Sequence, residues 1–186
     1  MKKDLNLFSL SDKKNNFQFL SHQYEGEFQL LEIKYNNSIH KIKLNLIGKV
    51  QLKNVLMAVI ASIKSNVNIK NILNVIPKIK SIDGRFDRVG RIKNNSRVIL
   101  DYAHTPDALK TCLKNIKEQF AGHKITLVFG CGGDRDQSKR AKMGKIADLF
   151  SDKIYLTDDN PRLEQPSKIR KDIKKGIKKQ KILEFP

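Results

Sequence analysis

Three clusters of charged residues and glycines each follow a short apolar run, and their residue types could do chemistry. The apolar runs are 98–100, 125–129 and 154–156. Asp and Arg side by side can hold a zwitterion, and glycines after a strand let backbone N–H groups approach an anion. The clusters contain Asp101 and His104, then Gly130, Cys131, Gly132, Gly133, Asp134, Arg135 and Asp136, then Asp158, Asp159, Asn160, Pro161 and Arg162.

Each cluster is followed by a segment with apolar residues at helical spacing. This alternation of strand, loop and helix from Arg97 onward predicts a parallel, doubly wound α/β sheet with right-handed crossovers. Thr105 and Pro106 are typical of a helix start, as N-cap and first-turn proline. Segment 182–186 looks like the beginning of a fourth strand. Because ligands bind at the carboxyl ends of such strands, the three clusters should share one edge of the sheet.

The first part of the chain has a different pattern. Three segments with β-branched and aromatic residues, separated by turn residues, predict antiparallel strands. Two segments with apolar residues at helical spacing then predict helices. All periodicity is lost over 81–88, where we expect a domain boundary. The strands are expected at 17–22, 28–35 and 39–47, and the helices at 55–66 and 69–76.

The chain of 186 residues is strongly basic, with 37 Lys and Arg against 19 Asp and Glu and a formal net charge of +18. Such a charge suggests nucleic acid or an anionic membrane surface. However, Lys, Asn and Ile are in excess together, and all have A/T-rich codons. The basic residues are also spread along the chain, with no Trp for base stacking. We therefore expect no nucleic-acid partner and no membrane partner.

Targeting segments and cysteine chemistry are not indicated. No run approaches the length of a membrane span, and the start of the chain lacks a signal-peptide core, which favours the cytoplasm. Cys112 and Cys131 are too few for a disulfide scaffold and lack metal-ligand spacing, so we expect no metal site. Cys131 could be an activated nucleophile, but a small residue in a crowded turn explains it better.

Other members of the clusters leave alternatives open. Gly130 to Gly133 match neither G-x-G-x-x-G nor a P-loop, so a tight turn competes with an anion site. His104 could be a structural hydrogen-bonding residue or a functional one. Asp134 and Asp136 could bind Mg²⁺. An internal salt network with the neighbouring cations is favoured instead; these are Arg135, Lys139 and Arg140.

Taken together, the clusters resemble the Mur ligase family in order and approximate spacing. The resemblance extends upstream, weakly before Gly48 and strongly from Gly84 to Arg162. It rests on D-Y-A-H-T-P-D-A-L at 101–109, F-G-C-G-G-D-R-D at 129–136 and D-N-P-R at 159–162, with Asn54 and G-R-F-D-R at 84–88 upstream. It implies an incomplete Rossmann-like doubly wound sheet over 93–186, a hinge at 84–92, and a partial α+β remnant of a central ATPase domain over 1–83.

The resemblance also implies an activity, ATP-dependent amide formation through an acyl phosphate. The implied substrates are a UDP-muramoyl dipeptide, meso-diaminopimelate and ATP, with Mg²⁺ held by parts of the ligase missing here, and a monomer is expected for the full ligase. Asn54, Arg85 and Asp101 would belong to the nucleotide side, with His104 near them in the cleft. Arg85, Asp101 and His104 would be the catalytic residues. Arg135, Asp159, Asn160, Pro161 and Arg162 would hold the incoming amino acid.

The sequence departs from the family pattern at several places. No G-x-x-x-x-G-K-[ST] occurs, Gln51 stands where the family usually has Asn, and the chain stops before the later Gly-Lys-Gly-His-Glu motif. We therefore expect a ligase fragment, or a decayed copy, that is inactive alone. Within the family the alternative is a lysine-adding ligase, against which Arg162 argues, because a guanidinium suits the second carboxylate of diaminopimelate. Outside it, the alternative is a non-catalytic basic binding module.

Overall fold

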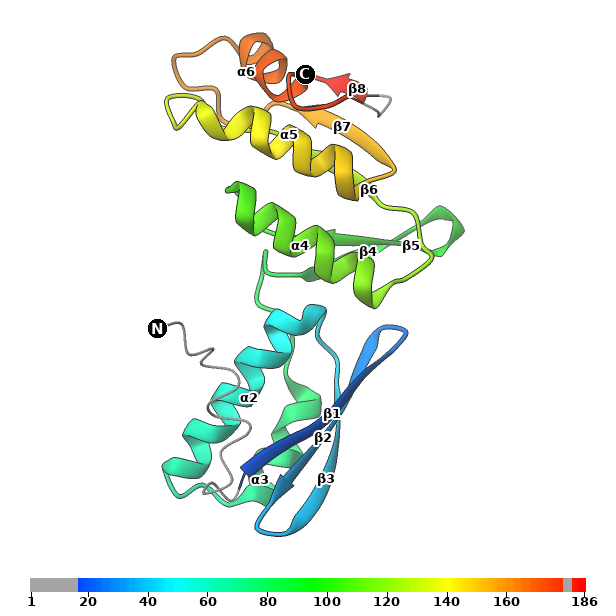
Figure 1. Ribbon diagram of the computed structural model, residues 1–186, viewed down its shortest axis with the longest axis vertical. Coiled ribbons are helices and arrows are strands. Elements are labelled where there is room, and N and C mark those ends of the chain that lie inside the picture. Colours follow the sequence, from blue (N-terminus) through cyan, green and yellow to red (C-terminus); the bar gives the residue numbers. More distant parts are fainter. Residues whose placement is uncertain (1–16, 179–181) are drawn as a thin grey trace. The chain divides into compact units, whose positions relative to one another are not determined.

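The computed structural model describes residues 17–178 and 182–186, and it divides into two compact units (Figure 1). The first unit ends at Leu100 and the second extends from Asp101 to Pro186. Residues 1–16, which belong to the predicted remnant domain, lie outside the described residues, as do residues 179–181. The domain limits at 83 and 93, with a hinge between them, stay predictions.

The first unit begins with an antiparallel sheet in the order β1-β2-β3, as the sequence predicts. The strands are β1 (Phe17–Glu25), β2 (Phe28–Tyr35) and β3 (Ser38–Leu44). Alternation gives the sheet one apolar face, on which Leu31, Ile33, Ile42 and Leu44 are buried. The β3 strand ends three residues before the predicted limit.

Two helices cover that apolar face (Figure 1). They are α2 (Gly48–Lys64) and α3 (Ile69–Val75), which is followed by a short 3₁₀ turn, η1 (Ile76–Lys78), that contains Pro77. The α2 helix buries apolar residues spaced three and four apart, so one stripe faces the sheet. Asn68 caps α3 by accepting a hydrogen bond from the Lys70 N–H at 2.9 Å. The predicted helices are confirmed, and α2 begins earlier than expected, at Gly48.

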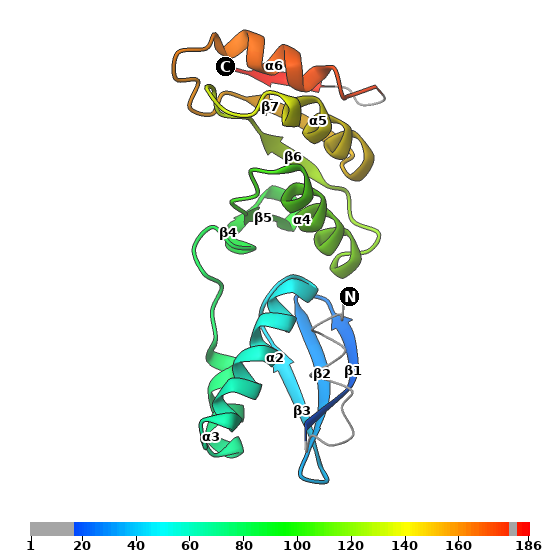
Figure 2. The same ribbon diagram turned by 60° about the vertical axis from the view of Figure 1, so that its left-hand side comes forward.

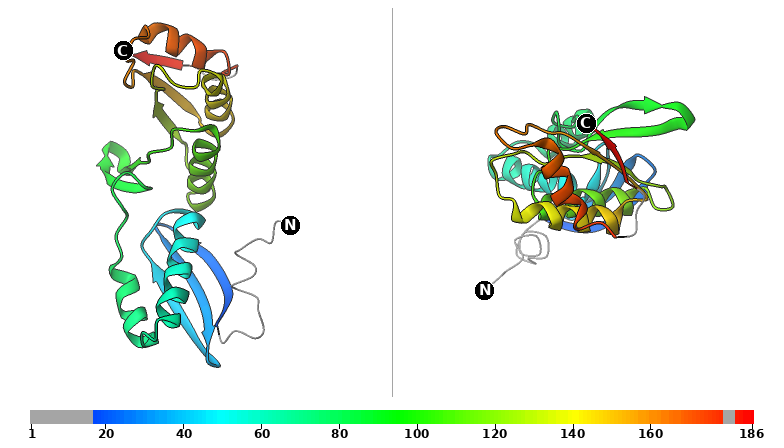
Figure 3. Two further views of the ribbon diagram at one scale, coloured as in Figure 1. Left: turned by 90° about the vertical axis from the view of Figure 1, so that its left-hand side faces the viewer. Right: turned by 90° about the horizontal axis from the view of Figure 1, so that it is seen from above.

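The next two strands form a hairpin that the sequence reading placed wrongly. β4 (Asp87–Ile92) pairs antiparallel with β5 (Ser96–Leu100), and η2 (Lys93–Asn95) joins them (Figure 3). We expected segment 98–100 as a strand of the parallel sheet. The reason for the difference is the turn: Asn94 and Asn95 both have positive φ, at 61° and 58°. A tight hairpin turn needs this backbone conformation, and Asn adopts it more readily than most residues.

The hairpin carries three arginines that surround one carboxylate. Glu27, in the turn between β1 and β2, lies 2.5 Å from Arg91 and 2.7 Å from Arg97. Arg88 donates hydrogen bonds to the Glu27 carbonyl and to Asn45. Glu27 and the three arginines line a cavity of about 220 Å³. The hydrogen bond from Arg97 is the largest factor that lowers the pKa of Glu27, so the carboxylate is held ionised among the arginines.

The second unit contains a parallel sheet in the order β6-β7-β8 (Figure 2). Its strands are β6 (Thr126–Phe129), β7 (Lys153–Thr157) and β8 (Ile182–Phe185). The helices are α4 (Pro106–Gln119), α5 (Ser138–Phe150) and α6 (Pro166–Lys174). The alternating α/β pattern, the helix start at Pro106 and the late strand at 182–185 are confirmed.

One face of the parallel sheet forms the core of this unit. Ile154 and Leu156 of β7 are fully buried in a cluster that includes residues of α4, α5 and α6. All three helices therefore pack on the same face, as expected when right-handed crossovers advance the strand order in one direction. This agrees with an incomplete doubly wound sheet, in which the described residues supply one helical layer. The loops after β6 and β7 leave from one edge.

Candidate functional site

The loop 101–105 enters α4 and carries the first predicted cluster. Thr105 caps α4 by accepting a hydrogen bond from the Ala108 N–H at 3.3 Å, as predicted. Asp101 is half-buried, and His104 is exposed. The His104 ring lies 3.2 Å from the Tyr102 carbonyl through Nδ1 and stacks edge-on with the Tyr102 ring. His104 thus has a local structural role, and its ring remains open to solvent.

Lys139, in the first turn of α5, connects the loop 101–105 to that helix. Its Nζ donates to the His104 carbonyl oxygen at 2.9 Å. This bond joins the loop 101–105 to the first turn of α5, which directly follows the second predicted cluster. The sequence predicts Lys139 in a salt network with Asp134 and Asp136. Hydrogen bonds from Ser138 are the largest cause that lowers the pKa of Asp136 and the charge of Lys139 contributes, but the direct hydrogen bond of Lys139 is to the loop 101–105.

Close backbone approach explains the glycines that follow β6. A Cβ placed on Gly133 would lie 1.8 Å from the Pro161 carbonyl oxygen, and one on Gly130 would lie 2.4 Å from the Thr157 carbonyl oxygen. The Gly133 N–H donates to the Asn160 carbonyl at 2.9 Å. The glycines thus let the loop after β7 pack against the loop after β6. This supports the tight-turn interpretation of the sequence.

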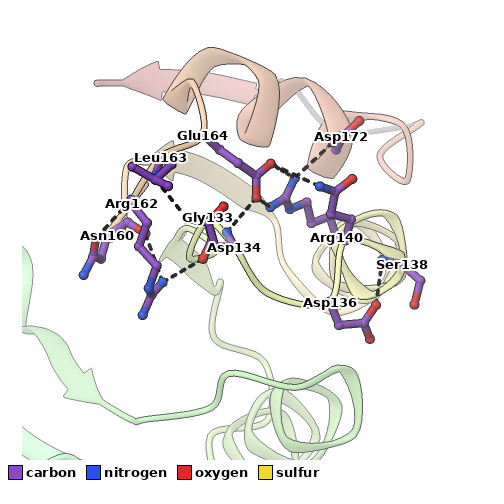
Figure 4. Close-up of polar contacts among 11 residues, drawn as sticks. Gly133, Asp134, Asp136, Ser138, Arg140, Asn160, Arg162, Leu163, Glu164 and Asp172 are labelled. Carbon is purple, nitrogen blue, oxygen red and sulfur yellow. Dashed lines mark hydrogen bonds and ion pairs between the residues drawn. The ribbon is translucent and has the colours of Figure 1, made fainter.

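Two non-glycine residues in these loops have left-handed backbone conformations. Asp134 has φ of 48° and Arg162 has φ of 52°. Such conformations persist only where surrounding contacts fix them. The Asp134 carboxylate accepts a hydrogen bond from the Leu163 N–H at 3.1 Å, and Arg162 Nη1 donates to the Gly133 carbonyl at 2.8 Å (Figure 4). The left-handed turn in each loop is therefore stabilised by a hydrogen bond to the other loop.

A buried ion pair lies behind the two loops (Figure 4). Arg140 of α5 is fully buried and forms a two-pronged pair with Glu164, at 2.6 and 2.9 Å. It also contacts Asp172 of α6 at 3.2 Å. Hydrogen bonds from Arg140 and from the Asp134 N–H lower the pKa of Glu164 to about 2.

The sequence predicts a salt network for Arg140 but names the wrong partners. Its carboxylate partners are Glu164 and Asp172, more than twenty residues away in the chain. Asp136 instead accepts from the Ser138 N–H at 2.9 Å at the start of α5. Arg135 does not join the network. No local spacing signal relates position 140 to positions 164 and 172, so sequence reasoning missed both acidic residues.

The predicted amino-acid residues are brought to one region of the second unit. Arg135 follows the left-handed Asp134, and Asp159 to Arg162 form the facing loop. Arg135 and Asp159 are exposed, and neither has a hydrogen bond or ion pair with any residue in the described ranges. An exposed guanidinium and an exposed carboxylate on two cross-linked loops can bind a ligand with opposite charges.

Cysteine chemistry is not supported by the geometry. The Cys131 thiol is buried and lies 3.7 Å from the Met143 sulfur. Burial is the main cause that raises its pKa, and it also raises the pKa of Cys112 to about 12. Cys131 is therefore a packing residue in a crowded turn, as predicted.

Within residues 17–178 and 182–186, no group of three or more His, Cys, Asp or Glu side chains is arranged to hold a metal ion. In the same ranges no helix is both long and apolar enough to cross a membrane.

The residues assigned to the nucleotide side are divided between the units. Asn54 is exposed on α2, and Arg85 is exposed in the segment before β4, both in the first unit. The Gln51 side chain donates to the Arg85 carbonyl at 3.3 Å, which places residue 85 beside the first turns of α2. Asp101 and His104 belong to the second unit. The structure therefore brings Arg85 next to the helix that carries Asn54.

The model of the Mur ligase glutamate ligase domain matches residues 84–186 of this chain. This match covers more than half of the sequence. The chain belongs to the Mur ligase family. The elements from β4 onward, with the polar loops, are thus those of the Mur ligase glutamate ligase domain. The strands β1 to β3 and the helices α2 and α3 precede the matched residues.

Three relatives of this chain carry the same name. The chain is 42% identical over 159 residues to the UDP-N-acetylmuramoyl-L-alanyl-D-glutamate–2,6-diaminopimelate ligase of Fusobacterium nucleatum, covering 82% of this chain and 32% of that protein. It is 46% identical over 153 residues to the enzyme of that name from Prochlorococcus marinus, covering 78% and 30%. The Buchnera aphidicola enzyme is 41% identical, covering 97% and 37%. This Mur ligase chain therefore spans about a third of the length of these relatives.

Solved structures agree with the fold. A structure of a UDP-N-acetylmuramoyl-L-alanyl-D-glutamate–2,6-diaminopimelate ligase superposes with a TM-score of 0.68 and 29% identity, over 95% of this chain and 36% of that one. A folylpolyglutamate synthase from Thermotoga maritima gives a TM-score of 0.72 at 20% identity, over 91% and 39%. The second likeness concerns the fold alone.

Proposed function

We propose that this Mur ligase chain forms the part of a diaminopimelate-adding ligase that receives the incoming amino acid. The observation that carries the proposal is the pair of cross-bonded loops, which place Arg135, Asp159 and Arg162 in one region of the second unit. The names of the relatives, at 41 to 46% identity, support the same substrate.

The charges of the loops suit this substrate. Diaminopimelate carries two carboxylates and two amines, whereas lysine has one carboxylate. Arg135 and Arg162 supply two guanidinium groups, whose planar forks match carboxylates, and Asp159 supplies an anion for an ammonium group. In this proposal the two arginines hold the carboxylates and Asp159 holds one amine, which leaves the other amine to attack.

The residues present fit only part of an ATP site. Asn54 and Arg85 are exposed in the first unit and Asp101 is half-buried in the second, but no P-loop occurs in this sequence. Bound ATP, with Mg²⁺, would supply the phosphoryl group that activates the carboxylate of the UDP-muramoyl dipeptide. In the proposal Asn54 lies near the adenine, Asp101 near the ribose and Arg85 toward the γ-phosphate, with His104 near these residues.

The proposal also covers location and partners. It places the ligase in the cytoplasm as a monomer, with small molecules as its partners and neither nucleic acid nor membrane among them. The cytoplasm supplies the ATP and the nucleotide-linked substrate that the reaction needs.

Titration of the 186-residue chain with meso-diaminopimelate and with L-lysine, followed by amide chemical shifts, tests the proposal. Diaminopimelate should bind more tightly than lysine and should shift the amides of both loops. Arg162→Ala should weaken diaminopimelate binding about thirty-fold or more, because a charge-assisted bidentate contact contributes about 2 to 5 kcal/mol. Arg162→Lys should keep only part of the wild-type affinity for diaminopimelate, since an ammonium group cannot make the bidentate contact of a guanidinium.

Two results would contradict the proposal. One is equal binding of lysine and diaminopimelate to the wild type, which would favour the lysine-adding alternative. The other is an Arg162→Ala variant that binds diaminopimelate as well as the wild type does.

A further inference from the structure

Arg140 is fully buried, yet it belongs to none of the residues assigned above to substrate. Its side chain is 1% exposed, and its guanidinium forms a fork with both carboxylate oxygens of Glu164, with a further contact to Asp172 (Figure 4). A buried ion pair is weak evidence of stabilisation, because desolvation of both charges offsets much of their attraction. Stability alone therefore does not explain an arginine at this position.

Glu164 connects the arginine to the glycine-rich loop. The Glu164 oxygen that accepts from Arg140 at 2.6 Å also accepts from the Asp134 N–H, at 2.7 Å. The Glu164 backbone N–H donates to the Pro161 carbonyl at 3.0 Å, within its own loop. The Glu164 carboxylate, oriented by Arg140, thus fixes the Asp134 amide in the first loop, while the backbone of the same residue bonds Pro161 in the second.

The two backbone positions lie next to the residues that would contact substrate. Asp134 directly precedes Arg135, and Pro161 directly precedes Arg162. Asp134 and Arg162 both have the left-handed conformation, which is unfavourable for residues with a side chain and needs external support. The direction in which each guanidinium leaves its loop therefore depends on contacts made by Glu164.

We propose that Arg140 is a positioning residue: through Glu164 it holds the loops 130–137 and 157–164 in one register, so that Arg135 and Arg162 face the same amino acid. This inference rests on the proposed function for its substrate. The fork is essential to it, because a lysine at position 140 keeps the charge but contacts the carboxylate as a single point and leaves Glu164 free to rotate.

The test uses the 186-residue chain with Arg140→Lys, and it has a readout that needs no ligand. The hydrogen exchange rate of the Asp134 amide reports its bond to Glu164. We expect Arg140→Lys to accelerate that exchange about tenfold or more and to weaken meso-diaminopimelate binding by a similar factor. The exchange of the β7 core amides of Ile154 and Leu156, which reports global unfolding, should change much less.

A matched control is available in Arg170 of α6. Arg170 is also buried and also pairs with two carboxylates, Asp158 and Glu184, and neither has a hydrogen bond to Asp134. Arg170→Lys should leave the Asp134 exchange rate unchanged. A second variant, Glu164→Gln, keeps an oxygen acceptor for the Asp134 N–H but weakens the fork, and should give an intermediate rate.

Each outcome decides a separate point. Unchanged Asp134 exchange in Arg140→Lys would overturn the inference, whatever the chain binds. Faster exchange with unchanged diaminopimelate affinity would also overturn the positioning role. Faster exchange in the variant, with no diaminopimelate binding by the wild type, would support the connection through Glu164 and contradict the proposed function instead. If Arg140→Lys unfolds, the Glu164→Gln variant answers the same questions.

Discussion

Replacing Gly133 with alanine should separate the two loops of the candidate site. A Cβ at this position would lie 1.8 Å from the Pro161 carbonyl oxygen and 2.6 Å from the Pro161 carbonyl carbon. These are backbone atoms, so no side-chain rotation relieves the clash. To reach ordinary contact at about 3.4 Å, the loop after β7 must retreat by about 1.6 Å.

That retreat breaks two hydrogen bonds. The Gly133 N–H to Asn160 carbonyl bond measures 2.9 Å and the Arg162 to Gly133 carbonyl bond measures 2.8 Å, so both would exceed 4 Å. A neutral hydrogen bond contributes about 1 kcal/mol and one from a charged donor about 1.5 to 3 kcal/mol. We therefore expect Gly133→Ala to lower the free energy of unfolding of the second unit by about 2 to 4 kcal/mol.

Gly132→Ala is the matched control in the same loop. Its Cβ would meet Arg162 Nη1 at 2.9 Å, and that atom is the far end of a flexible side chain that can move away. That movement disturbs the Arg162 to Gly133 hydrogen bond but leaves the Gly133 to Asn160 backbone bond intact. Gly132→Ala should therefore lower the unfolding free energy by about 1 kcal/mol less than Gly133→Ala does. Urea denaturation, followed by hydrogen exchange of Ile154 and Leu156, measures both variants on the second unit alone. Equal stability of the two variants would refute the close-approach argument.

Three further predictions concern other parts of the chain. Glu27→Ala should lower the free energy of unfolding of the first unit by about 1 to 3 kcal/mol, because it leaves Arg88, Arg91 and Arg97 without their carboxylate partner. Urea denaturation should show that added salt reduces this loss. The control Glu32→Ala, whose lysine partner is solvent-exposed, should lower the free energy of unfolding by less than about 1 kcal/mol. The pKa of Glu164 is about 2 in the folded chain and about 4.5 in the unfolded chain, so Glu164 should stabilise the fold above pH 4.5 and lose this effect as the pH falls toward 2. The melting temperatures of the wild type and of Glu164→Gln should therefore converge over that pH range. A constant difference between them would contradict this prediction. The 186-residue chain alone should release no phosphate from ATP, since no P-loop occurs in its sequence; release that depends on the amino-acid and dipeptide substrates would overturn this.

Periodicity is sufficient to predict most of the fold. The alternation of Ile42 and Leu44 in β3, and the apolar spacing of Ile169 and Ile173 in α6, are enforced by burial against a single face, so local pattern and tertiary structure agree. The β4–β5 hairpin was not predicted, because Asn94-Asn95 lacks the usual glycine of a tight turn. The apolar run at 98–100 then resembles a strand of the parallel sheet.

The polar loops could be located from the sequence, but the contacts between them could not. A position after a strand and before a helix places Gly130 and Asp159 at the same edge of a sheet, because parallel strands share their direction. Which carboxylate pairs with Arg140 depends on how two loops fold over each other, and no period relates residues 140, 164 and 172. Ion pairs between distant segments are therefore the features that sequence reasoning misses here.

The same distinction explains why the glycines of the loops are accompanied by a buried arginine in α5. Gly133 permits the backbones to touch, but close contact alone would allow the loops to slide, because a backbone hydrogen bond such as Gly133 to Asn160 can form in neighbouring registers. The fork between Arg140 and Glu164 removes that freedom, since its planar geometry admits one orientation of the carboxylate and hence one partner amide, that of Asp134. Gly133 thus allows the two loops to lie close together, and the Arg140–Glu164 ion pair fixes which residues of the two loops face each other. Under the proposed function the site distinguishes diaminopimelate from lysine by one carboxylate and would need both, because a guanidinium displaced by a single residue would lose its bidentate contact with that group.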